Sequence, residues 1–162
     1  MTTLKHYLYK LISEEVLAFE TYKVLNTLFY SKDRFQKSLI SLFDDISKDE
    51  YSDHAKKLID YAREHDLGFP ADNSDYVQCA SESAVKAFNH IPTGDGTITQ
   101  LLEYALNLER DAIDSYTEAI SRGMELDEFD EEIMSIMNHN LKDEVEHYDK
   151  ILVAHAASQE II

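Results

Sequence analysis

The sequence is poor in cysteine and in the two residues that most often interrupt helices. It contains two prolines and four glycines among 162 residues. Strand-rich folds use both residues in their many turns, so this scarcity predicts long helices joined by few loops. Cys79 is the only cysteine, which excludes an internal disulfide and any zinc or iron–sulfur site built from cysteine thiolates within one chain.

Long apolar runs and positive charge are also scarce. No stretch approaches the ~18 consecutive apolar residues of a membrane-spanning helix, and residues 1–6 lack the apolar core and cleavage site of a signal peptide. We therefore expect a cytoplasmic protein with no membrane partner. The formal net charge of −17 repels phosphate backbones, so nucleic acid is not an expected partner either.

Four segments carry apolar residues at the three- and four-residue spacing of an amphipathic helix. The first two span residues 3–30 and 34–65. The third opens at Thr97, whose hydroxyl can cap the helix while Gln100 reaches back to it. The fourth follows a short link around Gly123. The acidic residues 127–132 suit its start because negative charge interacts favourably with the positive end of the helix dipole.

The stretch from Asp66 to Gly96 holds both prolines and three of the four glycines. This punctuation predicts a long connection, with room for a short helix over 75–88. Short connections on either side of it let the helices of each half lie antiparallel. We expect an all-α fold, a single domain over residues 1–162. We expect this domain to be a four-helix bundle with one long crossover between the second and third helices.

The two halves of the chain repeat a pattern at a constant offset of 94 residues. Residues 15–22 (EVLAFETY) match residues 109–116 (ERDAIDSY), and the tripeptide Lys-Asp-Glu at 48–50 recurs at 142–144. The halves, at about 3–65 and 97–157, therefore look like two copies of a helical hairpin related by a pseudo-twofold axis. Such an axis would bring equivalent residues of all four helices towards one point in the core.

Each predicted helix carries a glutamate where its inner stripe calls for an apolar side chain, and two histidines share these faces. These residues are Glu15, Glu50, Glu109 and Glu144, with His54 and His147. Burying an unpaired carboxylate costs several kcal/mol, so four of them together require cations. Mixed carboxylate and imidazole ligands suit iron. We therefore expect two iron ions among these side chains.

This set of residues resembles the ligands of the ferritin-like di-iron carboxylate superfamily. Within it the chain is most similar to bacterioferritins and Dps-like mini-ferritins, over roughly residues 4–155. Glu144-Val-Glu-His147 has the family's Glu-x-x-His spacing. The resemblance implies that Glu15 and Glu109 each bind one ion as terminal ligands. It implies that Glu50 and Glu144 bridge both ions, and that His54 and His147 each bind one ion.

Two tyrosines also match the family. Tyr22 and Tyr116 correspond to tyrosines that hydrogen-bond across the bundle to the carboxylates and fix their orientation. The alternative is that both only pack in the core. With the four glutamates, these tyrosines are the residues that the resemblance implies for catalysis.

The second predicted helix departs from the family because it reads Glu50-Tyr-Ser-Asp53-His54, one residue longer than the usual spacing. Either a π-bulge between Glu50 and His54 lets the histidine reach the metal, or Asp53 replaces it. The first alternative is favoured because it keeps the following apolar residues facing inward. The other five histidines, His139 among them, lie off the inner stripes or in the crossover and are expected to be ordinary surface residues.

Two further departures concern haem and assembly. Tyr51 stands where bacterioferritins carry a haem-binding methionine, so no haem is expected. The sequence ends 15 residues after His147, without the fifth helix that lines the pores of 24-subunit cages. We therefore expect a homo-oligomer such as a shell of twelve or a smaller assembly.

The resemblance implies a ferroxidase that oxidises Fe(II) with dioxygen or peroxide, for iron storage or detoxification. Two alternatives use the same fold. One is a di-iron oxygenase or oxidase that acts on an organic substrate, and the other is a non-catalytic bundle that only binds metal.

Overall fold

The computed structural model describes residues 2–68 and 97–160, which form helices and turns without any strand in those two ranges. The helices are α1 (Thr3–Thr27), α2 (Arg34–Lys48), the π-helix η1 (Asp49–Ala55), α3 (Lys56–Glu64), α5 (Ile98–Gly123) and α6 (Glu131–Gln159). Because α2, η1 and α3 follow one another without a break, they form one long rod. The short helix predicted at 75–88 lies outside the described residues.

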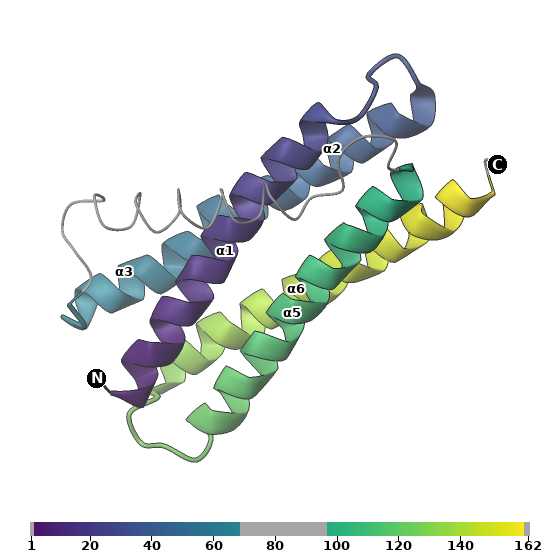
Figure 1. Ribbon diagram of the computed structural model, residues 1–162. Coiled ribbons are helices and arrows are strands. Elements are labelled where there is room, and N and C mark those ends of the chain that lie inside the picture. The colour runs from purple at the N-terminus through teal and green to yellow at the C-terminus, as the bar shows by residue number, and fades with distance from the viewer. Residues whose placement is uncertain (1, 69–96, 161–162) are drawn as a thin grey trace.

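The four rods form a bundle, which confirms the predicted all-α fold (Figure 1). α5 begins beside the end of α6, where the hydroxyls of Thr99 and Ser158 lie 2.9 Å apart. α3 ends beside the start of α6, where the Tyr61 hydroxyl donates to Asp130 Oδ2 at 3.0 Å. The connection from α3 to α5 therefore joins opposite ends of the bundle, as a long crossover must.

The caps of the last two helices follow from the sequence. The Thr97 hydroxyl accepts a hydrogen bond from the Gln100 amide at 3.3 Å, and the Gln100 side chain accepts one from the Thr97 amide at 3.1 Å. This is the predicted capping box. Asp130 caps α6 by accepting from the Ile133 amide at 2.9 Å, and the acidic residues around it form the start of that helix, as expected.

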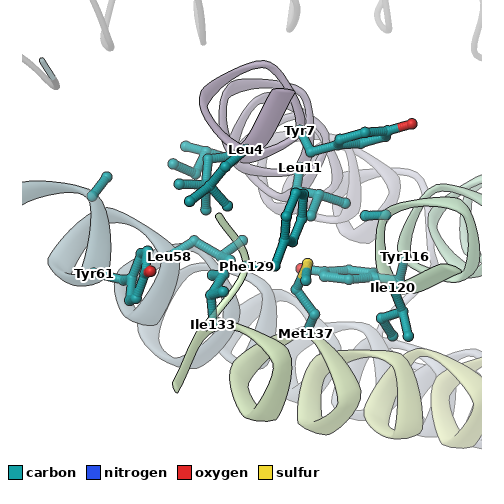
Figure 2. Close-up of a cluster of buried hydrophobic side chains, with 14 residues drawn as sticks. Leu4, Tyr7, Leu11, Leu58, Tyr61, Tyr116, Ile120, Phe129, Ile133 and Met137 are labelled. Atoms are coloured by element: carbon teal, nitrogen blue, oxygen red, sulfur yellow. The ribbon is translucent and has the colours of Figure 1, made fainter. Parts of the chain in front are cut away.

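Two clusters of buried apolar side chains fill the bundle, one towards each end. The first joins the start of α1 to α3, the end of α5 and the start of α6, and it includes Leu11, Leu58 and Met137 (Figure 2). The second joins the end of α1 to α2, the start of α5 and the end of α6, and it includes Phe43 and Leu102. Between the clusters, every rod contributes polar residues to the core instead. None of the helices in the described ranges is long and apolar enough to cross a membrane.

The end of α5 depends on a glycine because the turn to α6 folds tightly against it. A Cβ atom on Gly123 would lie 2.6 Å from Met134 Sδ and 2.7 Å from Phe129 Cδ2. Phe129 is buried in the first cluster, so its ring has little room to move. Gly123→Ala should therefore lower the free energy of unfolding by about 1–3 kcal/mol.

Thermal unfolding followed by circular dichroism measures this effect. Ser121→Ala, at an exposed position of the same helix, serves as the control and should change stability by no more than about 0.5 kcal/mol. Equal midpoints for the two variants would contradict the close packing at Gly123.

Candidate metal centre

Six ionisable side chains from all four rods meet between the two apolar clusters. Each residue is at most 2% exposed, and the six are Glu15, Glu50, His54, Glu109, Glu144 and His147. These are the residues that the sequence singles out as metal ligands. The structure brings all six together.

The ligand atoms of these residues fall into two overlapping groups. Glu15, Glu50, His54 and Glu144 form one group, and Glu50, Glu109, Glu144 and His147 form the other, with the atoms of each group within 4.8 Å of one another. Glu50 and Glu144 belong to both groups. Each group thus has one glutamate and one histidine of its own and shares two carboxylates with its neighbour. This is the arrangement expected for two adjacent cations bridged by carboxylates.

The Nδ1 atoms of both histidines face the carboxylates. His54 Nδ1 lies 3.0 Å from a Glu144 oxygen and 3.4 Å from oxygens of Glu15 and Glu50. His147 Nδ1 lies 3.4 Å from Glu50, 3.7 Å from Glu144 and 3.8 Å from Glu109. Ligands bonded to one ion at about 2.0–2.2 Å stand about 3 Å apart when their bonds are near right angles. Both groups therefore match the spacing of a shared ion after small side-chain shifts.

Several buried atoms of the centre have no hydrogen-bond partner. They are both carboxylate oxygens of Glu50, one oxygen each of Glu109 and Glu144, and Nδ1 of His147. The contacts of these atoms at 3.4–3.8 Å lack hydrogen-bond geometry. Buried polar atoms without partners are rare and costly. Cations would supply the missing partners, and carboxylates with imidazoles are a donor set that suits iron.

Protons balance the charge of the centre when no cation is bound. Burial raises the pKa of Glu50 to about 8, and the neighbouring Glu15 carboxylate adds to this shift. Burial alone would lower the pKa of His147, but the adjacent carboxylates of Glu144 and Glu50 raise it to about 11 overall. Because a bound cation requires ionised carboxylates and neutral imidazoles, it must displace these protons.

The second rod reaches the centre through the π-helix η1. Glu50 and His54 are 1% and 0% exposed, and Leu58 and Tyr61 after them also stay buried. The side chain of Asp53 is instead 34% exposed and pairs with Lys57 at 2.7 Å. The π-helix favoured by the sequence is thus present, and it turns His54 rather than Asp53 towards the other core residues. Such helices are frequent at functional sites.

Two tyrosines connect the halves of the bundle. The hydroxyl of Tyr22 donates to Glu109 Oε1, and the hydroxyl of Tyr116 donates to Glu15 Oε1. Both tyrosines are buried. Burial and the nearby carboxylates raise the pKa of each phenol well above its usual value, so both hydroxyls remain protonated donors. They therefore hold the carboxylates in addition to packing in the core.

Sequence reasoning missed two aspartates behind the histidines. Asp143 Oδ2 lies 3.1 Å from His54 Nε2, and Asp49 Oδ2 lies 3.1 Å from His147 Nε2. A carboxylate at this position accepts the Nε2 proton, which orients the ring and leaves Nδ1 free for a cation. The repeated tripeptide Lys-Asp-Glu contains both aspartates, so the repeat itself was the signal that could have identified them.

Asn140 is another residue of the centre that sequence reasoning missed, and the repeat gives it no equivalent in the other half of the chain. Its side-chain amide donates to the Tyr116 hydroxyl at 2.9 Å. The position 94 residues earlier is Ile46, which cannot do the same for Tyr22. The two halves of the centre therefore share their glutamates, histidines, tyrosines and aspartates and differ at this position.

Comparisons with known proteins agree with this fold. The sequence model of the family described as "Ferritin: Ferritin-like domain" matches residues 5–154. Among solved structures, the chain is similar to the bacterioferritin-related protein from Bacteroides fragilis, which is described as a dodecameric thioferritin. The two share 21% sequence identity over 98% of this chain and 88% of that one, with a TM-score of 0.73. A search of curated proteins gives no match.

Proposed function

This chain belongs to the family of ferritin-like domains, and on that premise we propose that it is a di-iron ferroxidase. It binds two Fe(II) ions per chain and oxidises them with dioxygen or peroxide, for iron storage or detoxification. The observation that carries this proposal is the pair of overlapping, buried ligand groups that share Glu50 and Glu144.

Fe(II) is the substrate in this proposal. Glu15 and Glu109 each bind one ion, while Glu50 and Glu144 bind both. Nδ1 of His54 and of His147 completes one ligand set each. Anionic oxygen ligands stabilise ferric over ferrous iron, so this ligand set favours oxidation. Two Fe(II) ions supply the two electrons that convert dioxygen, with two protons, to hydrogen peroxide.

The other residues of the centre control protons and ligand orientation. Asp143 and Asp49 accept the Nε2 protons of the two histidines and keep Nδ1 of each ring directed at the carboxylates. Tyr22 and Tyr116 fix one oxygen of each terminal glutamate. The apolar clusters on both sides limit water near the ions and so strengthen their attraction to the carboxylates.

Aerobic addition of Fe(II) to the metal-free protein tests the proposal. Ferric absorbance and dioxygen consumption are followed over many additions without an organic substrate. A ferroxidase should oxidise many Fe(II) ions per chain faster than buffer does. Oxidation that stops after two ions per chain would instead indicate a retained cofactor, as in an oxygenase. Oxidation no faster than in buffer would indicate a non-catalytic metal-binding bundle.

We also propose that the protein works as a homo-oligomer without haem. The similar protein from Bacteroides fragilis is described as dodecameric, which supports the first part. For the second part, Tyr51 is 43% exposed and packs on Phe19 with ring centroids 4.9 Å apart. A tyrosine also offers no thioether sulfur to a haem iron, which supports the second part.

Removing the Tyr22 hydroxyl should slow oxidation while the fold is kept. Tyr22→Phe leaves the ring packed against Phe43 but frees the Glu109 oxygen that the hydroxyl holds. Loss of such an orienting hydrogen bond typically costs about 10–100-fold in metal affinity or activity. Initial rates of Fe(II) oxidation, with Tyr30→Phe at an exposed position as the control, measure the effect. A Tyr22→Phe rate equal to that of the control would leave this tyrosine with a packing role only.

A further inference from the structure

A second group of ligand-type side chains lies directly outside His54. It consists of Asp53 on η1 with His139 and Asp143 on α6. His139 Nε2 lies 2.9 Å from Asp53 Oδ2 and 3.3 Å from Asp143 Oδ2. The same Asp143 oxygen lies 3.1 Å from Nε2 of His54. Exposure of the side chains falls along this path, from 45% for His139 and 34% for Asp53 to 23% for Asp143 and 0% for His54.

The geometry of this group fits one divalent ion. Two carboxylate oxygens, one from each aspartate, lie 2.9 Å and 3.3 Å from Nε2 of His139. These distances are close to the separation of about 3 Å between two ligands that bind one ion at about 2.0–2.2 Å. The other oxygen of Asp53 pairs with Lys57 at 2.7 Å, which leaves Oδ2 directed at His139. One imidazole with two carboxylates is a ligand set that suits divalent iron, manganese or zinc.

The internal repeat does not reproduce this group in the other half of the chain. Asp49 is the equivalent of Asp143 and faces His147 in the same way. The position equivalent to His139, however, is Asp45, so the repeat places no imidazole there. Asp53 is available at the surface because η1 carries the additional residue of the second rod. Asp53 and His139 therefore have no equivalents in the other half of the repeat.

We propose that Asp53, His139 and Asp143 form a third site, which binds a divalent transition-metal ion. This site passes ions between the bundle surface and the buried centre. None of the three residues belongs to the two buried ligand groups, so the site can bind an ion of its own. Its connection to the centre is the contact between Asp143 and His54. The passage of ions rests on the proposed function, whereas the binding of an ion at this site does not.

Anaerobic titration of the full-length, metal-free protein with Co(II) tests the site, with heat and visible absorbance as readouts. The wild type should bind three ions per chain. His139→Ala and Asp53→Asn should each bind two. Asp45→Asn, at the matched exposed position of the other half, should still bind three. Two ions in the wild type, or three in His139→Ala, would overturn the proposal.

The Glu50→Gln variant separates this proposal from the ferroxidase proposal. If both hold, Glu50→Gln retains one ion, and adding His139→Ala removes it. If the wild type binds a single ion that is lost in His139→Ala and kept in Glu50→Gln, the third site stands and the di-iron centre fails. If Glu50→Gln binds no ion, the third site fails.

Passage of ions has its own readout. At limiting Fe(II), His139→Ala should oxidise iron more slowly than the wild type. When two Fe(II) ions per chain are loaded without dioxygen and oxygenated buffer is then added, both proteins should react at the same rate. Equal rates in the first experiment would show that the third site does not deliver iron to the centre.

Discussion

Glu50→Gln should abolish rapid Fe(II) oxidation and remove both iron ions from the centre. Glu50 belongs to both ligand groups, and neither of its oxygens has a hydrogen-bond partner in the protein. Substitution of Glu50 should therefore affect cation binding more than it affects the fold. Loss of an orienting hydrogen-bond partner typically costs about 10–100-fold in activity. Loss of a ligand shared by both ions should reduce the rate of Fe(II) oxidation by more than that.

Metal analysis after anaerobic loading and stopped-flow oxidation measure the two effects. Glu109→Gln is the matched comparison because Glu109 belongs to one group only, and it should retain one of the two ions. Wild-type oxidation by Glu50→Gln would exclude a bridging role for this residue. So would equal ion loss in the two variants.

The same variant separates a role in metal binding from a role in stability. Burial raises the pKa of Glu50 to about 8, so the folded, metal-free protein holds a proton on this residue that the unfolded chain releases near pH 4.5. Stability of the metal-free wild type should therefore fall as the pH rises through this window. Glutamine does not titrate, so Glu50→Gln should lose less stability over the same range. Urea unfolding at several pH values measures the difference.

His54→Ala should remove one of the two central ions and slow oxidation, whereas Asp53→Ala should leave the central pair intact. The reason is that η1 buries His54 beside Glu15, Glu50 and Glu144, while Asp53 faces Lys57 and His139 at the surface. A single-turnover experiment on protein loaded without dioxygen isolates the centre from the third site. His147→Ala should resemble His54→Ala, because it removes the histidine of the other group.

One outcome would overturn the assignment of ligands in the second rod. If Asp53→Ala alone stops oxidation and His54→Ala leaves it unchanged, the centre uses a single histidine. Circular dichroism should accompany both variants, because His54→Ala also leaves a cavity in the core. A folded but inactive His54→Ala supports the ligand role, and added imidazole that restores its activity would strengthen it.

Much of the fold and of the centre could be read from the sequence. The spacing of apolar residues predicted all four rods, and Thr97 with Gln100 predicted a capping box that is present. The six core residues stood out because each interrupts an apolar stripe with a charge or an imidazole. Even η1 followed from one extra residue between Glu50 and the next apolar positions. These features are local, because helical periodicity alone decides which face of a helix a residue occupies.

Only the tertiary structure decided which residues meet across helices. The family resemblance implied that Tyr22 reaches a carboxylate across the bundle, but it did not say that this carboxylate is Glu109. Nor did the sequence show that Asp143 accepts from His54 or that His139 faces Asp53, since all three pairs are 86–89 residues apart. Contacts of this kind depend on how far each helix is rotated and shifted against its neighbours. Packing of the two apolar clusters sets that register, and no periodicity within one helix contains it. The sequence thus determined the residues of the centre, and the packing of the bundle determined their partners.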